Sequence, residues 1–84
     1  MIIGYKIKID TIEKVKKFVG IVDTFENDID LIEKRYIVNA KSVMGIFSLD
    51  LTNPLEVIIR NASMNDATRL QELMEEFRVD ENEL

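Results

Sequence analysis

The stretch that decides the fold is V-N-A-K-S-V-M-G-I-F-S-L, residues 38–49. Val38 ends a short apolar run that is typical of a β-strand, and Ser42 stands where a serine caps the start of a helix. The helix predicted over about 43–50 carries more large apolar residues than one buried face needs. The segment therefore predicts a strand, a capped turn and a short helix, some of whose apolar side chains lie outside its buried face.

Upstream, residues 2–9 alternate between apolar and polar side chains, which predicts a half-buried strand. Asp10 and Glu13 then have the spacing of a capping box, with Asp10 as the N-cap of a helix over about 11–24. Gly20 inside this helix costs about 1 kcal/mol relative to alanine unless close packing requires it. The apolar face of the helix is predicted to consist of Ile12, Val15, Phe18, Val22 and Phe25.

Two further strands are expected at 28–33 and 36–38, joined as a hairpin by the polar segment 33–35. The Thr-Asn-Pro sequence at 52–54 breaks the chain, and 55–60 is rich in β-branched residues, which favours another strand.

Ser63 and Asp66 form a second capping-box pair, which predicts a last helix over about 64–77. Its inner face is expected to consist of Ala67, Leu70, Met74 and Phe77. Residues 1–78 are thus predicted to form one domain, followed by an acidic, frayed tail at 79–84.

The predicted order is β-α-β-β-α-β-α, and its compact solution has two layers. We expect an α+β open-faced sandwich, in which three helices cover one face of a four-stranded antiparallel sheet.

Composition excludes several classes of function. The net charge of −5 argues against nucleic-acid binding, and no apolar run is long enough for a membrane span or a signal peptide. With no cysteine, the chain fits a reducing cytoplasm. With no histidine, no cysteine and three glycines, it shows no catalytic triad, metal site or nucleotide loop. We therefore expect neither enzymatic activity nor a cofactor or metal.

The segment N-A-K-S-V-M-G-I-F-S-L at 39–49 resembles the regulatory-serine region of HPr, the phosphocarrier of the bacterial sugar phosphotransferase system. Weaker similarity comes from D-I-D-L at 28–31 and from N-A-S-M-N-D-A before the last helix. The resemblance extends over about residues 2–78 and implies the HPr fold.

HPr carries phosphate on a histidine that is followed by an arginine and a proline. By the family's spacing from Ser42, these positions fall on Thr11, Glu13 and Lys14, and none of the three residues is retained. The resemblance therefore implies a relative that lacks the imidazole nucleophile and has a carboxylate in place of the phosphate-binding guanidinium.

The family's regulatory serine corresponds to Ser42. In the family an HPr kinase phosphorylates this serine, and the product is a corepressor for a catabolite-control transcription factor, so the resemblance implies protein partners of these kinds. Lys41 is expected to favour the added phosphate. Helix capping alone also explains the serine.

Val43, Met44 and Phe47 correspond to the family's apolar docking patch. If Ile46 and Leu49 form the buried face of the short helix, Met44 and Phe47 lie on a partly exposed one. The alternative is that they belong to the core or are scattered surface residues.

The sequence as a whole favours a non-catalytic, regulatory HPr-like protein that acts through contacts around 43–50 and through phosphorylation of Ser42. One alternative is a divergent structural or oligomerisation module, which leaves self-association open. The other is a phosphocarrier with a displaced acceptor, for which Thr11 is the candidate.

Overall fold

The computed structural model describes residues 3–79. In chain order the elements are β1 (Ile3–Ile7), α1 (Ile12–Val22), β2 (Ile29–Glu33), β3 (Tyr36–Asn39), α2 (Val43–Phe47), β4 (Leu55–Ile59), α3 (Met64–Met74) and the 3-10 turn η1 (Glu75–Phe77). Each predicted strand and helix is present, with ends that differ by a few residues.

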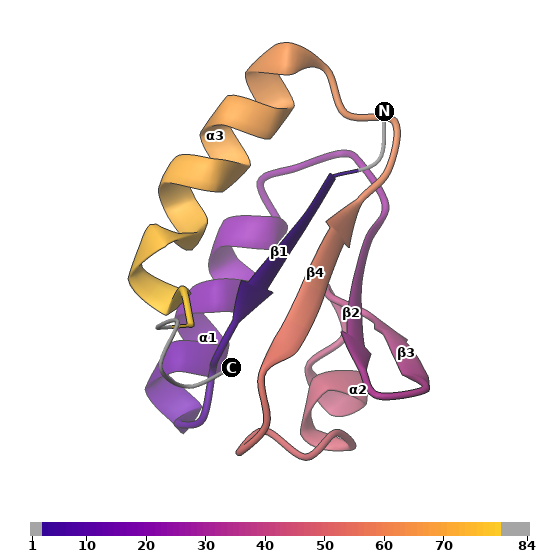
Figure 1. Cartoon of the computed structure of the whole chain (residues 1–84), viewed down its shortest axis with the longest axis vertical. Helices are drawn as coiled ribbons and strands as arrows, with labels where there is room; N and C mark the ends of the chain where they lie inside the picture. Colours follow the sequence, from indigo (N-terminus) through magenta and orange to yellow (C-terminus); the bar gives the residue numbers. More distant parts are fainter. Residues whose placement is uncertain (1–2, 80–84) are drawn as a thin grey trace.

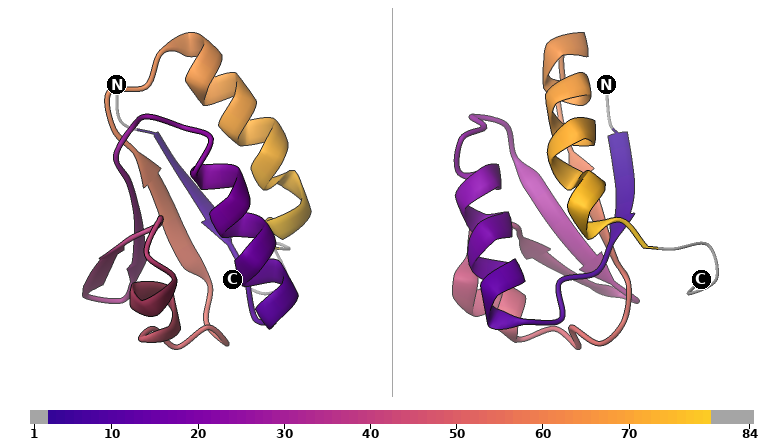
Figure 2. Two further views of the ribbon diagram at one scale, coloured as in Figure 1. Left: turned by 180° about the vertical axis from the view of Figure 1, so that it is seen from behind. Right: turned by 90° about the vertical axis from the view of Figure 1, so that its left-hand side faces the viewer.

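The four strands form one antiparallel sheet in the order β1-β4-β2-β3. The helices lie on one face of the sheet and leave the other face open (Figures 1 and 2). The predicted α+β open-faced sandwich is therefore confirmed.

The core lies between the sheet and the helices. β2 and β4 bury every second residue, as expected for strands with one covered face. From the helical layer, Phe18 and Phe77 meet edge to face with ring centroids 6.1 Å apart. Buried residues of α1 and α3 complete this layer, among them Val15, Val22, Leu70 and Met74.

The predicted start of α1 is wrong by one residue. The N-cap is Thr11, whose hydroxyl accepts a hydrogen bond from the Lys14 amide at 3.1 Å, and Asp10 instead forms an ion pair with the Lys14 ammonium at 3.2 Å. Threonine and aspartate are both good N-caps, so their spacing could not choose between them. Ile12, predicted to be buried, is 59% exposed in the first turn.

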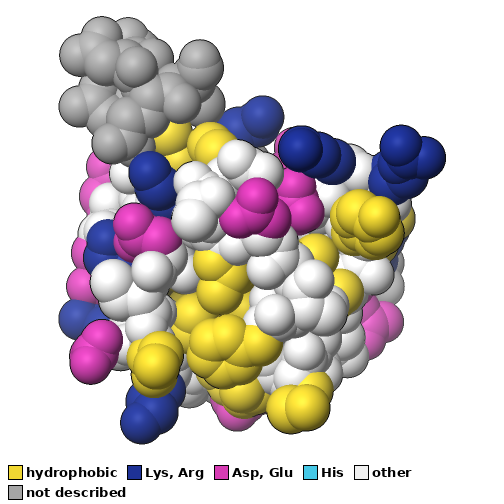
Figure 3. All heavy atoms as spheres, turned by 90° about the horizontal axis from the view of Figure 1, so that it is seen from below, with side chains coloured by type: hydrophobic (Ala, Val, Ile, Leu, Met, Phe, Trp, Pro, Cys, Tyr) yellow, Lys and Arg dark blue, Asp and Glu magenta, His cyan; other side chains and the backbone are white. Residues whose placement is uncertain are grey.

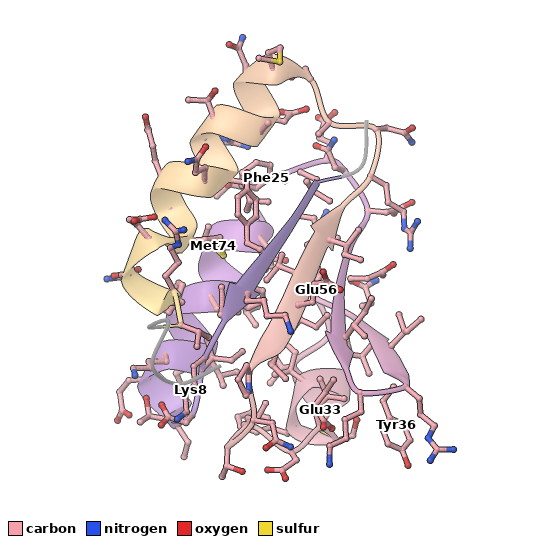
Figure 4. The ribbon with its side chains drawn as sticks, in the orientation of Figure 1. Lys8, Phe25, Glu33, Tyr36, Glu56 and Met74 are labelled. Carbon is pink, nitrogen blue, oxygen red and sulfur yellow. The ribbon has the colours of Figure 1, made fainter. Side chains whose placement is uncertain are left out.

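The hairpin between β2 and β3 is confirmed, with Lys34 in the left-handed region at φ 56°. Glu33, which the sequence places at both the end of the strand 28–33 and the start of the polar turn, ends β2 and is only 4% exposed. Its carboxylate accepts hydrogen bonds from the Asn53 side chain at 3.3 Å and from the Asp50 amide at 3.5 Å. Glu33 thereby ties the loop after α2 to the hairpin, and Figure 4 shows it beside α2.

The capping box of α3 is confirmed, because the Ser63 hydroxyl accepts from the Asp66 amide and the Asp66 carboxylate accepts from the Ser63 amide. The helix is α-helical to Met74 and tightens into η1, so the predicted helix 64–77 is two elements. Its predicted inner face is buried apart from Ala67, which is half-buried. Most of the predicted acidic tail, at 80–84, lies outside the described residues.

Gly20 has no packing role that requires glycine. A Cβ atom at this position would have no heavy atom within 4 Å, and the residue is exposed.

We expect Gly20→Ala to raise the free energy of unfolding by about 0.5–1 kcal/mol in urea melts, because alanine lowers the entropy lost on helix formation. Gly45→Ala is the matched control, since its Cβ would lie 3.2 Å from Ser42 Oγ and 3.3 Å from Val38 Cβ. Equal gains from both substitutions would contradict this difference in packing.

Candidate functional site

The site that the sequence predicts around Ser42 is built on the start of α2. Ser42 has extended backbone angles, and its hydroxyl accepts a hydrogen bond from the Gly45 amide at 3.1 Å. Its carbonyl accepts from the Ile46 amide at 3.0 Å. Ser42 therefore caps α2, as predicted.

Gly45 allows this cap to form in a crowded place. The position that a Cβ would occupy is 3.2 Å from Ser42 Oγ and 3.3 Å from the Val38 side chain. A Cβ at this position would thus be pressed between the half-buried Ser42 hydroxyl and Val38 of β3. A residue with a side chain at 45 would push against the cap that starts the helix.

The helix divides its apolar residues as expected. Ile46 is fully buried and Leu49 is 8% exposed. On the opposite side, Met44 is 83%, Phe47 47% and Val43 44% exposed, and these three residues are called the α2 patch below. Figure 3 shows hydrophobic side chains gathered on this lower face of the molecule. The alternative that Met44 and Phe47 belong to the core is excluded.

Lys41 makes two hydrogen bonds within the chain. Its ammonium donates a hydrogen bond to the Phe25 carbonyl at 2.6 Å, and its amide donates to the Asn39 side chain at 2.8 Å. Lys41 therefore links the segment before α2 to the loop after α1, and its expected help to a phosphate on Ser42 stays a prediction.

At the positions that correspond to the family's phosphate-carrying loop, the side chains bond to other groups of this chain. The Thr11 hydroxyl accepts from the Lys14 amide. The hydrogen bond from the Lys14 ammonium lowers the pKa of the Asp10 carboxyl. Lys17 forms an ion pair with Glu76 at 2.7 Å. Two of the three lysines of α1, Lys14 and Lys17, thus already have acidic partners.

A shallow cleft of about 200 Å³ lies at this end of the molecule, between α1 and the end of the last helix. It is lined by Glu13, Lys14, Lys17, Glu76 and Phe77. Acidic and basic side chains alternate around it, so it offers no concentrated positive charge to a phosphoryl group.

A larger polar hollow of about 590 Å³ lies at the other end of the sheet, near the start of α3. Two arginines and three acids contribute to its wall, and both arginines are engaged. Arg60 forms an ion pair with Asp30 at 3.1 Å, and Arg69 lies 3.7 Å from the centre of the Phe25 ring. The sequence analysis did not single out this hollow, because its residues come from three separated segments.

Residues 3–79 contain no group of three His, Cys, Asp or Glu side chains that could hold a metal ion. None of their helices is long and apolar enough to cross a membrane.

Comparison with known proteins identifies the family. Residues 13–78 match the family model described as the PTS HPr component phosphorylation site. The chain therefore belongs to the HPr family. The match begins two residues after Thr11, the position that the family's spacing assigns to the histidine.

Solved HPr structures share the fold. A phosphocarrier protein HPr from Bacillus anthracis str. Ames superposes with a TM-score of 0.69 at 20% identity, covering 92% of this chain and 98% of that one. HPr-C-His from Thermoanaerobacter tengcongensis superposes with a TM-score of 0.67 at 24% identity, covering 92% and 90%. No curated protein matches the chain.

The cap predicts a specific pattern of stability. Ser42→Ala should lower the free energy of unfolding by about 0.5–2 kcal/mol, because the Gly45 amide loses its acceptor. Ser42→Asp should be nearly neutral, since aspartate is an equally good N-cap. Denaturant melts of the three proteins measure both effects. A harmless Ser42→Ala would show that the hydroxyl does not stabilise α2.

Proposed function

We propose that this HPr-family protein does not carry phosphohistidine and instead regulates other proteins through the α2 patch. The observation that carries the proposal is the exposure of Met44 and Phe47 on a helix whose Ile46 is fully buried. Methionine and aromatic side chains are enriched at adaptable protein interfaces. The proposal places the protein in the cytoplasm, with an HPr kinase or a transcription regulator as the expected kind of partner.

Loss of the carrier function is supported by chemistry. A phosphohistidine needs an imidazole nitrogen as the nucleophile, and the chain contains no histidine. Thr11 is a poor substitute, because its hydroxyl is an N-cap that accepts a backbone hydrogen bond. Glu13 adds a carboxylate to the first turn of α1, where it would repel a phosphoryl group.

Phosphorylation of Ser42 is the second part of the proposal. The hydroxyl is half-buried and lies against the Gly45 amide, so an added phosphate would remain at the start of α2. Lys41 could pair with that phosphate only by leaving the Phe25 carbonyl. Modification would place negative charge immediately beside the α2 patch and change the partners it accepts.

The first test is phosphoryl transfer. The protein incubated with the phosphotransferase system's first enzyme and labelled phosphoenolpyruvate should incorporate no label. Thr11→His should also remain unlabelled, because Glu13 still repels phosphate and no arginine is restored. Stoichiometric labelling of the unmodified chain would contradict the proposal and favour a displaced acceptor.

The second test separates docking from stability. Changing Met44 and Phe47 together to polar residues should lower the free energy of unfolding by less than about 1 kcal/mol, since both side chains are exposed. Binding to an HPr kinase, measured by calorimetry, should weaken by about 1–2 kcal/mol or more. Met64→Gln is the matched control, because Met64 is 73% exposed on α3 and lies outside the α2 patch. Unchanged binding by the double variant would remove the patch from the interface.

A further inference from the structure

The two edges of the sheet are protected to different degrees. β1 carries Lys6 and is followed by Lys8, whose amide donates to the Phe77 carbonyl at 2.8 Å. The Val79 amide donates to the Lys6 carbonyl at 3.3 Å, so the chain after η1 covers this edge. Natural sheets commonly protect their edges with lysines and covering segments of this kind.

β3, at the opposite edge, has no lysine within the strand, although Lys34 and Arg35 precede it, and the chain covers only its last carbonyl, that of Asn39. Its first three residues are the uncharged Tyr36, Ile37 and Val38, and within residues 3–79 no strand lies beyond it. Tyr36 is 60% and Ile37 62% exposed. Figure 4 shows Tyr36 projecting from the outer end of the hairpin.

The register of the hairpin shows which backbone groups of β3 point outward. The Ala40 amide donates to the Ile29 carbonyl at 2.8 Å, so Ala40 faces β2. In an antiparallel ladder, residues alternate between bonding to the partner strand and pointing away from it. Ile37 and Asn39 therefore point away from β2. The Asn39 carbonyl already accepts from the Ser42 amide at 3.0 Å, and the N–H and C=O of Ile37 face outward as a pair.

We propose that β3 pairs antiparallel with β3 of a second copy of this chain, across a two-fold axis between the two Ile37 residues. The N–H of each Ile37 then donates to the C=O of the other, which extends the sheet across both copies. The same pairing also brings side chains together on the open face of the sheet. Ile37 is the register partner of Ile32, so the pairing joins the two copies' Ile32–Ile37 pairs into one apolar row.

The edge itself favours a second copy as the occupant, because the outward N–H and C=O of Ile37 complement the same two groups of another copy, and charge does not oppose this pairing. The hairpin turn of each copy carries Lys34 and Arg35. Antiparallel pairing brings this turn next to Asn39 of the other copy, and Asn39 is the register partner of Asp30. Asp28 lies just before β2 at the same end, but Asp30 is paired with Arg60 and Lys41 follows β3 there, so each basic turn meets an end of mixed charge. The contact uses neither Met44 nor Phe47 and is independent of the proposed docking function.

Sedimentation of the full chain tests this pairing. Measurements should extend to about 1 mM, because an edge contact of four residues belongs to the small, weak class of interfaces. The wild-type chain should show a monomer–dimer equilibrium. Ile37→Lys should weaken it about tenfold or more, whereas Met44→Lys, in the α2 patch, should leave it unchanged. A wild-type monomer throughout, or a dimer that only Met44→Lys weakens, would overturn the proposal.

A disulfide test gives the register directly. The chain contains no cysteine, so Ile37→Cys introduces one thiol per copy. Opposed residues in a bonded antiparallel pair have Cα atoms about 5.5 Å apart, within the range that a disulfide spans. Under mild oxidation Ile37→Cys should cross-link markedly faster than Lys6→Cys, the exposed control on β1. Equal rates for the two variants would contradict the two-fold pairing.

Discussion

The hydrogen bond from the Gly45 amide to the Ser42 hydroxyl is the contact on which the candidate site depends. α2 has only five residues, and a helix of that length has little stability of its own. It persists because Ser42 satisfies its first turn and Ile46 is buried in the core. Since these two residues fix the rotation of the helix, Met44 and Phe47 must lie on the exposed side.

The start of α1 shows how the family's fold can remain with other residues at the positions of its phosphate-carrying loop. Thr11 stands at the position that the family's spacing assigns to the histidine. Here it is the N-cap of α1, and its hydroxyl accepts a hydrogen bond from the Lys14 amide. Asp10 and Glu76 pair with lysines that could otherwise attract phosphate. Membership of the HPr family and the proposed loss of its carrier chemistry are therefore compatible. What the chain retains is the scaffold that presents α2.

The sequence predicted the features that depend on local pattern. Alternation identified the strands, helical spacing identified Val15, Phe18 and Val22 as core residues, and Ser42 was identified as a cap. What the sequence did not predict concerns interactions between distant segments or choices between equivalent residues. Glu33 is buried because Asp50 and Asn53 supply its donors from a later loop. Lys41 bonds to the Phe25 carbonyl, 16 positions away, and no local pattern marks that contact.

The central claim is that the folded protein presents Met44 to partners, and methionine-methyl NMR with a soluble paramagnetic probe tests it most directly. Two methionines serve as internal references, because Met64 is 73% exposed and Met74 only 1% exposed. Met44 is 83% exposed. The account therefore predicts that the probe broadens the Met44 methyl signal at least as strongly as the Met64 signal, while the Met74 signal stays sharp. A Met44 signal as well protected as that of Met74 would contradict it.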